Sequence, residues 1–170
     1  MKYLLSILLL LGTLSMNAQD YTNAIGIRGG TNSGLTFKHF LNPTIAAEGI
    51  LSTKYGGFVL TGLVEKHKPL DVSTLHMTNL SFFYGVGGHF GSFRNGHSVP
   101  YFSNHGSSPV EHYNGFTTLG INFIGGVEYQ FDAIPFNIAL DVMPFWSLNS
   151  HYASASSFFD VALSIRYILN

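Results

Sequence analysis

The sequence contains no cysteine and few charged residues. Without cysteine, the 170-residue chain can form no disulfide, bind no metal through thiolates and use no thiol nucleophile. Charged residues make up 10% of the chain, against roughly 25% in an average soluble domain. Eight Lys and Arg oppose nine Asp and Glu, which excludes the basic surface that a nucleic-acid partner requires. A surface facing water would therefore carry unusually little charge.

Long apolar runs are absent after the first residues of the chain. The sequence begins with a cation at Lys2, continues with an apolar run from Tyr3 to Leu14, and then reaches the small and polar residues Asn17-Ala18-Gln19. This order is typical of a cleavable signal peptide, and the run is shorter than the roughly 20 residues of a spanning helix. We predict a signal peptide over 1–19 and one domain over 20–170. That domain is then either soluble or a membrane β-barrel.

The predicted domain alternates apolar and polar residues with a period of two, which is typical of β-strands. Over 159–167 the odd positions are large and apolar, and the even positions are small or charged. Turn signals such as Asn42-Pro43 separate the alternating segments. Eight strands are expected, over 24–30, 34–41, 44–52, 57–66, 80–93, 118–131, 136–142 and 159–169.

Alternation alone does not say which face of the sheet is buried, but the positions of the charges do. Eight charged residues lie in mid-strand on the face opposite the large apolar side chains. Inside an eight-stranded barrel they can pair across a lumen barely wide enough for side chains. We therefore predict an all-β, eight-stranded antiparallel up-and-down transmembrane β-barrel. Its predicted lumen charge network consists of Arg28, Lys38, Glu48, Glu65, Glu128, Asp141, Asp160 and Arg166.

Glycine and aromatic residues agree with a small membrane barrel. Six glycines share the charged face, as a tightly curved sheet requires: Gly26, Gly34, Gly85, Gly87, Gly120 and Gly126. Aromatic side chains near strand ends are expected to form girdles at the two membrane interfaces. They are Tyr84, Phe90, Tyr129, Phe131, Phe136, Phe145, Trp146, Phe159 and Tyr167.

Within the network, we expect Arg28 and Arg166 to lie on strands that close the barrel against each other. These two cations would share the carboxylates of Asp160, Asp141 and Glu128. Such a network is expected to plug the lumen, because a diffusive porin needs roughly 16 strands.

Several segments resemble a known family. They are the end of the export signal Asn17-Ala18-Gln19, the stretches 84–89 (YGVGGH) and 125–129 (GGVEY), and the last strand 159–167 (FDVALSIRY). Together they resemble the small outer-membrane β-barrel proteins common in Bacteroidetes, which are similar to the eight-stranded OmpA, OmpX and opacity-protein barrels. The resemblance implies an outer-membrane location, contact with outer-membrane lipid, and both termini in the periplasm.

With that orientation, strand parity assigns each connection to one side. Segments 42–43, 67–77 and 132–135 face the periplasm, whereas 29–33, 53–56, 94–115 and 148–156 face outward. The longest outer loop, 94–115, is the expected contact with an extracellular or envelope protein. Its candidate contact residues are His97, Tyr101, His105, His112 and Tyr113.

The outer loops also carry residue types that occur in metal sites and in catalytic sites. The two longest outer loops contain His97, His105, His112 and His151, with Glu111 beside His112. The first three are spaced by eight and seven residues, which matches no tight metal-ligand motif, so no metal or other cofactor is expected. His105, Ser107 and Glu111 bring imidazole, hydroxyl and carboxylate together in sequence, which leaves a lipid A deacylase-like or acyltransferase-like enzyme as an alternative. One loop gives these groups no rigid support, and we expect no enzyme. A soluble, lipocalin-like barrel with an apolar ligand inside is the other alternative.

Overall fold

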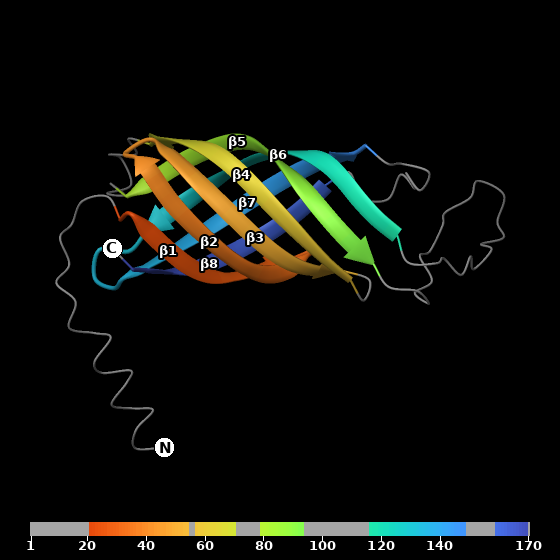
Figure 1. Cartoon of the computed structure of the whole chain (residues 1–170). Coiled ribbons are helices and arrows are strands. Elements are labelled where there is room, and N and C mark those ends of the chain that lie inside the picture. The colour runs from red at the N-terminus through yellow and green to blue at the C-terminus, as the bar shows by residue number, and fades with distance from the viewer. Residues whose placement is uncertain (1–20, 55–56, 71–78, 94–115, 149–158, 170) are drawn as a thin grey trace, which may run out of the picture.

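The alternating segments form eight strands in a computed structural model that describes residues 21–54, 57–70, 79–93, 116–148 and 159–169. The strands are β1 (Asn23–Gly30), β2 (Ser33–Asn42), β3 (Ile45–Lys54), β4 (Gly57–Pro69), β5 (Leu80–Phe93), β6 (Phe116–Gln130), β7 (Phe136–Ser147) and β8 (Phe159–Ile168). Each pairs antiparallel with the next, and β8 pairs with β1, so the sheet closes (Figure 1). The all-β, eight-stranded up-and-down barrel is confirmed.

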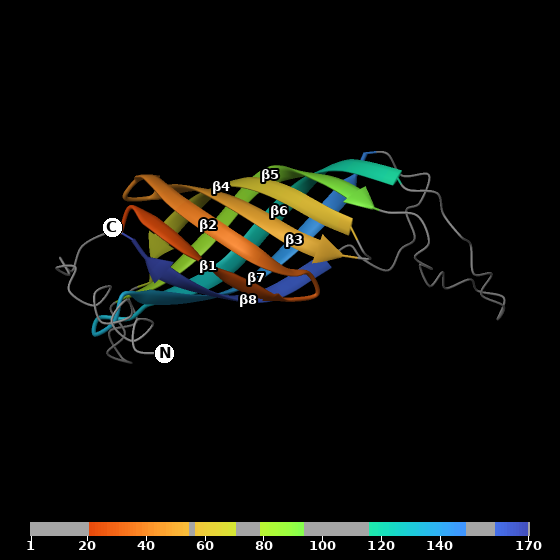
Figure 2. The same cartoon turned by 60° about the horizontal axis from the view of Figure 1, so that its bottom comes forward.

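The strands wind around the barrel at a tilt, as Figures 1 and 2 show from two directions. β1 begins and β8 ends at the same end of the barrel, which we call the terminal end; the opposite end is the distal end. In the described part of the chain, no helix is long and apolar enough to span a membrane.

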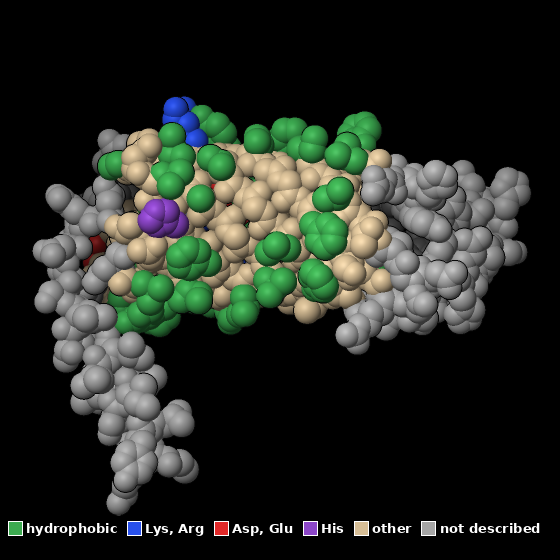
Figure 3. Space-filling model, in the orientation of Figure 1, with side chains coloured by type: hydrophobic (Ala, Val, Ile, Leu, Met, Phe, Trp, Pro, Cys, Tyr) green, Lys and Arg blue, Asp and Glu red, His purple; other side chains and the backbone are tan. Residues whose placement is uncertain are grey.

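The barrel is apolar outside, and its interior holds the charged side chains beside a small buried apolar cluster. Leu163 on β8, Ile121 on β6 and Leu140 on β7 are 45%, 44% and 51% exposed. On the inner face, Arg166 of β8 and Glu128 of β6 are only 1% and 4% exposed. Hydrophobic side chains are spread over the outer face of the barrel visible in Figure 3, and charged ones are few there. An interior that holds ion pairs differs from the apolar interior that the lipocalin-like alternative requires.

Glycine allows neighbouring strands to approach on the inner face. A Cβ built on Gly26 would lie 2.0 Å from the carbonyl oxygen of Ile165, across the β1–β8 pairing that closes the barrel. On β5, a Cβ on Gly87 would lie 1.9 Å from the carbonyl oxygen of Gly62 on β4. Any larger residue at either position would push two strands apart.

Two strands, β4 and β7, extend three or more residues beyond their predicted ends. β4 continues through Pro69, so His67 is a buried strand residue and not the start of a turn. β7 continues to Ser147, past Pro144, where the prediction ended at Val142. Pairing of β6 with β7 skips the positions around Pro144, which has no N–H to donate, and resumes in the same register at Asn122 and Phe145.

The predicted girdle residues with exposed side chains lie on the outer face of the barrel. Phe145, which was also predicted to belong to a girdle, lies on the inner face. Its ring meets His89 edge-on, with centroids 5.6 Å apart, on the inner face of the barrel. Trp146, its neighbour, points outward and is 72% exposed. The prediction for Phe145 was therefore wrong, because a strand that continues past Pro144 keeps its alternation.

Candidate functional site

Charged side chains in the barrel interior form two clusters. The larger one, called the Lys38 cluster, consists of Lys38, Glu48, Glu65, Glu128 and Arg166. The smaller one, called the Arg28 cluster, consists of Arg28, Asp141 and Asp160. All eight side chains are buried, although ionised groups are almost never buried unless they are paired.

Lys38 holds three carboxylates from three different strands. Its Nζ lies 2.8 Å from Glu65 on β4, 3.1 Å from Glu128 on β6 and 3.2 Å from Glu48 on β3. The ammonium also sits 4.5 Å from the centre of the Phe83 ring on β5. A lysine on β2 thereby connects strands around half of the barrel.

Arg166, on β8, reaches two of the same carboxylates. Its guanidinium lies 2.6 Å from Glu48 and 3.3 Å from Glu128, and its Nε donates to the Thr36 hydroxyl at 3.3 Å. Thr36 in turn donates to Glu48. Glu48 and Glu128 are thus each held between a lysine and an arginine.

Aromatic rings cover the Lys38 cluster on the side of the terminal end. Tyr21, just before β1, is buried and donates its hydroxyl to Glu128. Its ring meets Phe40 edge-on at 4.9 Å, Phe40 lies 4.9 Å from His67, and His67 stacks on Phe83 at 5.1 Å. Burial, and next the Glu128 carboxylate, raise the pKa of the Tyr21 phenol well above its usual value. The phenol therefore stays protonated and keeps its hydrogen bond.

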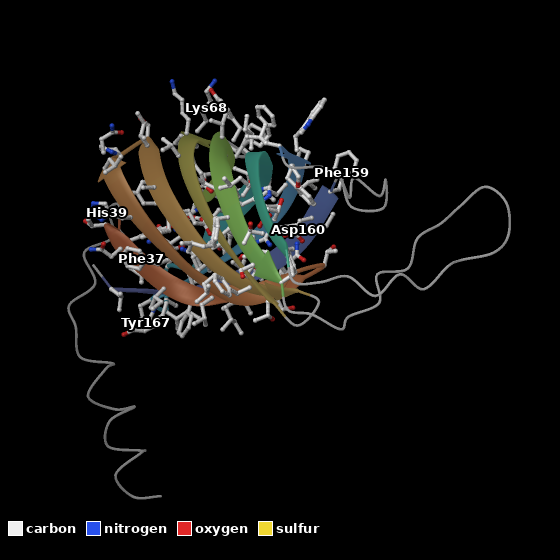
Figure 4. The ribbon with its side chains drawn as sticks, turned by 45° about the vertical axis from the view of Figure 1, so that its right-hand side comes forward. Phe37, His39, Lys68, Phe159, Asp160 and Tyr167 are labelled. Atoms are coloured by element: carbon white, nitrogen blue, oxygen red, sulfur yellow. The ribbon has the colours of Figure 1, made fainter. Side chains whose placement is uncertain are left out.

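The Arg28 cluster lies nearer the distal end. Arg28 donates to Asp141 on β7 and, at 2.6 Å, to Asp160 on β8. Asp160 also accepts the backbone N–H of Asn32 at 3.2 Å, in the turn between β1 and β2. Figure 4 shows Asp160 turned into the barrel, whereas Lys68 and Tyr167 point away from it.

The two clusters cross-link strands of the barrel. The described interior holds five carboxylates and three permanent cations, and most of them are engaged with one another. Among the described residues, no group of three or more His, Asp or Glu could hold a metal ion. The geometry therefore supports a structural network between strands.

The fold has a counterpart among solved structures. The crystal structure of the N-terminal β-barrel domain of Pseudomonas aeruginosa OprF matches this chain with a TM-score of 0.61. The match covers 87% of this chain and 98% of the OprF domain, at 11% sequence identity. The chain has the fold of the OprF barrel. At this identity the likeness shows the fold alone, and no protein-family profile and no curated protein sequence matches the chain.

The structure brings the eight predicted network residues together, but as two separate clusters. Arg28 takes Asp141 and Asp160, and Arg166 takes Glu128. Glu48, which the sequence placed in the network without a specific partner, is the nearest carboxylate to Arg166. Arg28 thus has two acids of its own, whereas Arg166 shares Glu48 and Glu128 with Lys38.

Other members of the network were not found from the sequence. Tyr21 precedes the first expected strand, and His67 falls in an expected turn, so neither was assigned to the inner face. Thr36 and Phe83 do lie on that face in the alternation, and their position was the signal that could have found them. The candidate loop residues His97, Tyr101, His105, His112 and Tyr113, and the possible catalytic set His105, Ser107 and Glu111, lie outside the described residues.

Proposed function

We propose that the chain is an integral outer-membrane β-barrel protein with a plugged lumen and a structural or surface-interaction role. One observation carries the proposal: the described barrel exposes 29 large hydrophobic side chains while its ion pairs lie inside. Soluble monomers rarely expose contiguous apolar patches larger than a few hundred Å². A barrel with an apolar outer face and a polar interior is the arrangement of outer-membrane barrels.

The interior supports the proposed plug. Lys38, Arg166 and Phe83 are among the largest fully buried side chains, and they project from different strands into the same cross-section. An eight-stranded barrel has an interior just wide enough for side chains to fill. The proposed protein is therefore a scaffold in the membrane and not a diffusive pore or an enzyme.

The surface-interaction role is proposed for segment 94–115, which joins β5 to β6 at the distal end. The family resemblance of the sequence supports an orientation with the terminal end in the periplasm. A contact through this segment would then be extracellular, with an envelope or external protein as partner. The signal peptide over 1–19 and the relation to Bacteroidetes proteins remain predictions.

Cell fractionation tests the location. Expressed from its full sequence, the protein should sediment with outer membranes, require detergent for extraction, and migrate differently on SDS gels before and after boiling. Recovery in the soluble fraction, with no folded band on the unboiled gel, would contradict the proposal.

Planar-bilayer recording tests the plug. The folded protein should show no stable open-channel current, and the Lys38→Ala/Arg166→Ala variant should pass more ions if it still gives the folded band. A wild-type conductance as large as that of a wide porin would show that the lumen is open.

A further inference from the structure

The outer face of the barrel carries a groove that the proposed scaffold role does not use. Two adjoining hollows, of about 400 and 490 Å³, share Gly49 on β3 and Gly62 on β4 as their floor. No atom lies within 4 Å of a Cβ built on either glycine, so the space above them is open. Figure 3 shows a band of backbone between hydrophobic side chains over β3 and β4.

The walls of the groove are apolar and extend along the barrel. Near the terminal end they include Phe37 and Val64, and towards the distal end they include Leu60 and Leu119. Val64 and Leu60 are four residues apart on β4, which is about 13 Å of strand. One leaflet of a bilayer has about half of its roughly 30 Å hydrocarbon thickness. The groove therefore has the length of one acyl chain within one leaflet.

Cationic and polar groups lie where this chain would meet its headgroup. His39 lines the groove near the terminal end, and its Nδ1 lies 2.8 Å from Asn23 Oδ1. Lys66 and Lys68 follow Val64 on the outer face of β4, and they are the only exposed cations among the side chains that the structure describes. Lys68 lies 5.7 Å from the centre of the Tyr84 ring, and Figure 4 shows it pointing away from the barrel.

We propose that this groove is a binding site for one anionic phospholipid. An acyl chain would lie over Gly49 and Gly62, and the headgroup phosphate would lie beside His39 and Lys66. The inference rests on the proposed membrane location, which in the expected orientation puts the headgroup in the periplasmic leaflet. Lysine side chains near an interface attract anionic headgroups.

A second copy of the chain fits the groove less well. Two barrels inserted in the same direction and packed through this face would bring two sets of Lys66 and Lys68 to the same depth. Like charges brought together in this way oppose association. The charge at the groove is complementary to a phosphate.

Native mass spectrometry of the full-length protein, released from detergent micelles, tests the site. The probes are dioleoyl phosphatidylglycerol and dioleoyl phosphatidylcholine, which have the same acyl chains. One phosphatidylglycerol should stay bound, in preference to phosphatidylcholine. Gly62→Leu fills the open space and should weaken retention about tenfold, which corresponds to about 1.4 kcal/mol.

Two variants separate the acyl chain from the headgroup. Lys66→Gln should reduce the preference for phosphatidylglycerol about fivefold, since each lysine near anionic lipid contributes about 1 kcal/mol. Gly29→Leu, on β1, is the matched control. A Cβ built on Gly29 also points into open space, since the nearest atom is the Leu163 carbonyl oxygen at 4.0 Å. This control should bind lipid as the wild type does.

The outcomes are distinct from those that test the membrane location. Equal retention of the two lipids, an unchanged Gly62→Leu variant, or a dimer in place of bound lipid overturns the lipid site while the barrel remains a membrane protein. A protein that gives no heat-modifiable folded band in detergent overturns the proposed function first.

Discussion

Arg166 on β8 donates to the carboxylate of Glu48 on β3 at 2.6 Å, although the two strands are not neighbours in the barrel. The bond therefore crosses the interior, and it lies beside the second bond of Arg166 to Glu128 on β6. Ladder hydrogen bonds join each strand only to the next one. The Lys38 cluster adds connections across the barrel.

Breaking this connection from one side should destabilise the barrel strongly. Arg166→Met leaves Glu48 and Glu128 with one fewer cation in a buried site, and such a loss costs about 3–5 kcal/mol. Urea unfolding in lipid vesicles, followed by the fluorescence of Trp146, measures the effect. Trp146 is the single tryptophan of the chain and lies on the outer face.

A double-mutant cycle shows how much of this cost belongs to the pair. Glu48→Gln added to Arg166→Met should recover part of the lost stability, with a coupling energy of about 0.5–3 kcal/mol. In vesicles of phosphatidylcholine, Lys66→Gln, which removes an exposed cation, should change stability by no more than about 0.5 kcal/mol. Additive effects of Arg166→Met and Glu48→Gln would mean that the two groups are not coupled.

Tyr21 should make stability depend on pH at the alkaline end. Its pKa in the folded state is raised, whereas an unfolded tyrosine titrates near about 10. The stability that it contributes is complete below the unfolded pKa and is lost as the pH rises towards the folded value. Tyr21→Phe removes the titrating group, so the difference in unfolding free energy between wild type and variant should shrink above about pH 10. A difference that stays constant across this range would contradict the assignment.

Substitution of inner-face glycines should affect barrel closure. Gly26→Ala puts a methyl group against the Ile165 carbonyl oxygen, so β1 and β8 must move apart, at a cost of about 1–3 kcal/mol or more. Gly49→Ala is the control, since nothing lies within 4 Å of its Cβ. The folded fraction on unboiled SDS gels should fall for Gly26→Ala only. Equal folded fractions would show that the β1–β8 pairing tolerates a side chain at position 26.

A charge on the outer face should report what surrounds the barrel. Leu140→Arg, near the middle of β7, should cost about 2–4 kcal/mol if lipid covers this position. Leu148→Arg, just beyond the end of β7, should cost about 0–1 kcal/mol. In a barrel surrounded by water, the two variants would have similar stabilities, and urea unfolding distinguishes the two results.

The sequence predicted the strand order, and the period of two together with the positions of the charges predicted which face of most strands points inward. Leu163 and Arg166 differ by an odd number of positions and therefore lie on opposite faces. The alternation does not give the end of a strand when polar residues occupy both faces, as at His67 and Lys68. The alternation also did not predict that β7 continues past Pro144. Proline lacks the N–H that would bond to the neighbouring strand, and whether the strand tolerates this loss depends on its pairing with β6.

The sequence could not predict which acid pairs with which cation inside the barrel, and the reason is geometric. Which acid meets which cation depends on strand tilt, and tilt moves residues of distant strands into the same cross-section. Lys38 and Glu65 therefore meet at 2.8 Å from strands that are not adjacent. Tyr21 was missed because residues before a first strand carry no alternation.

The position of the arginines in the chain has a consequence for how the barrel assembles. Arg166 and Asp160 both belong to the last strand, and their partners belong to strands made much earlier. Until that strand arrives, Glu48, Glu65 and Glu128 share the single ammonium of Lys38, and Arg28 has only Asp141. The last strand adds one cation and one acid, so the excess of acids in the interior stays the same and their pairing changes. Closure of the barrel and the final distribution of its ion pairs therefore depend on the same strand.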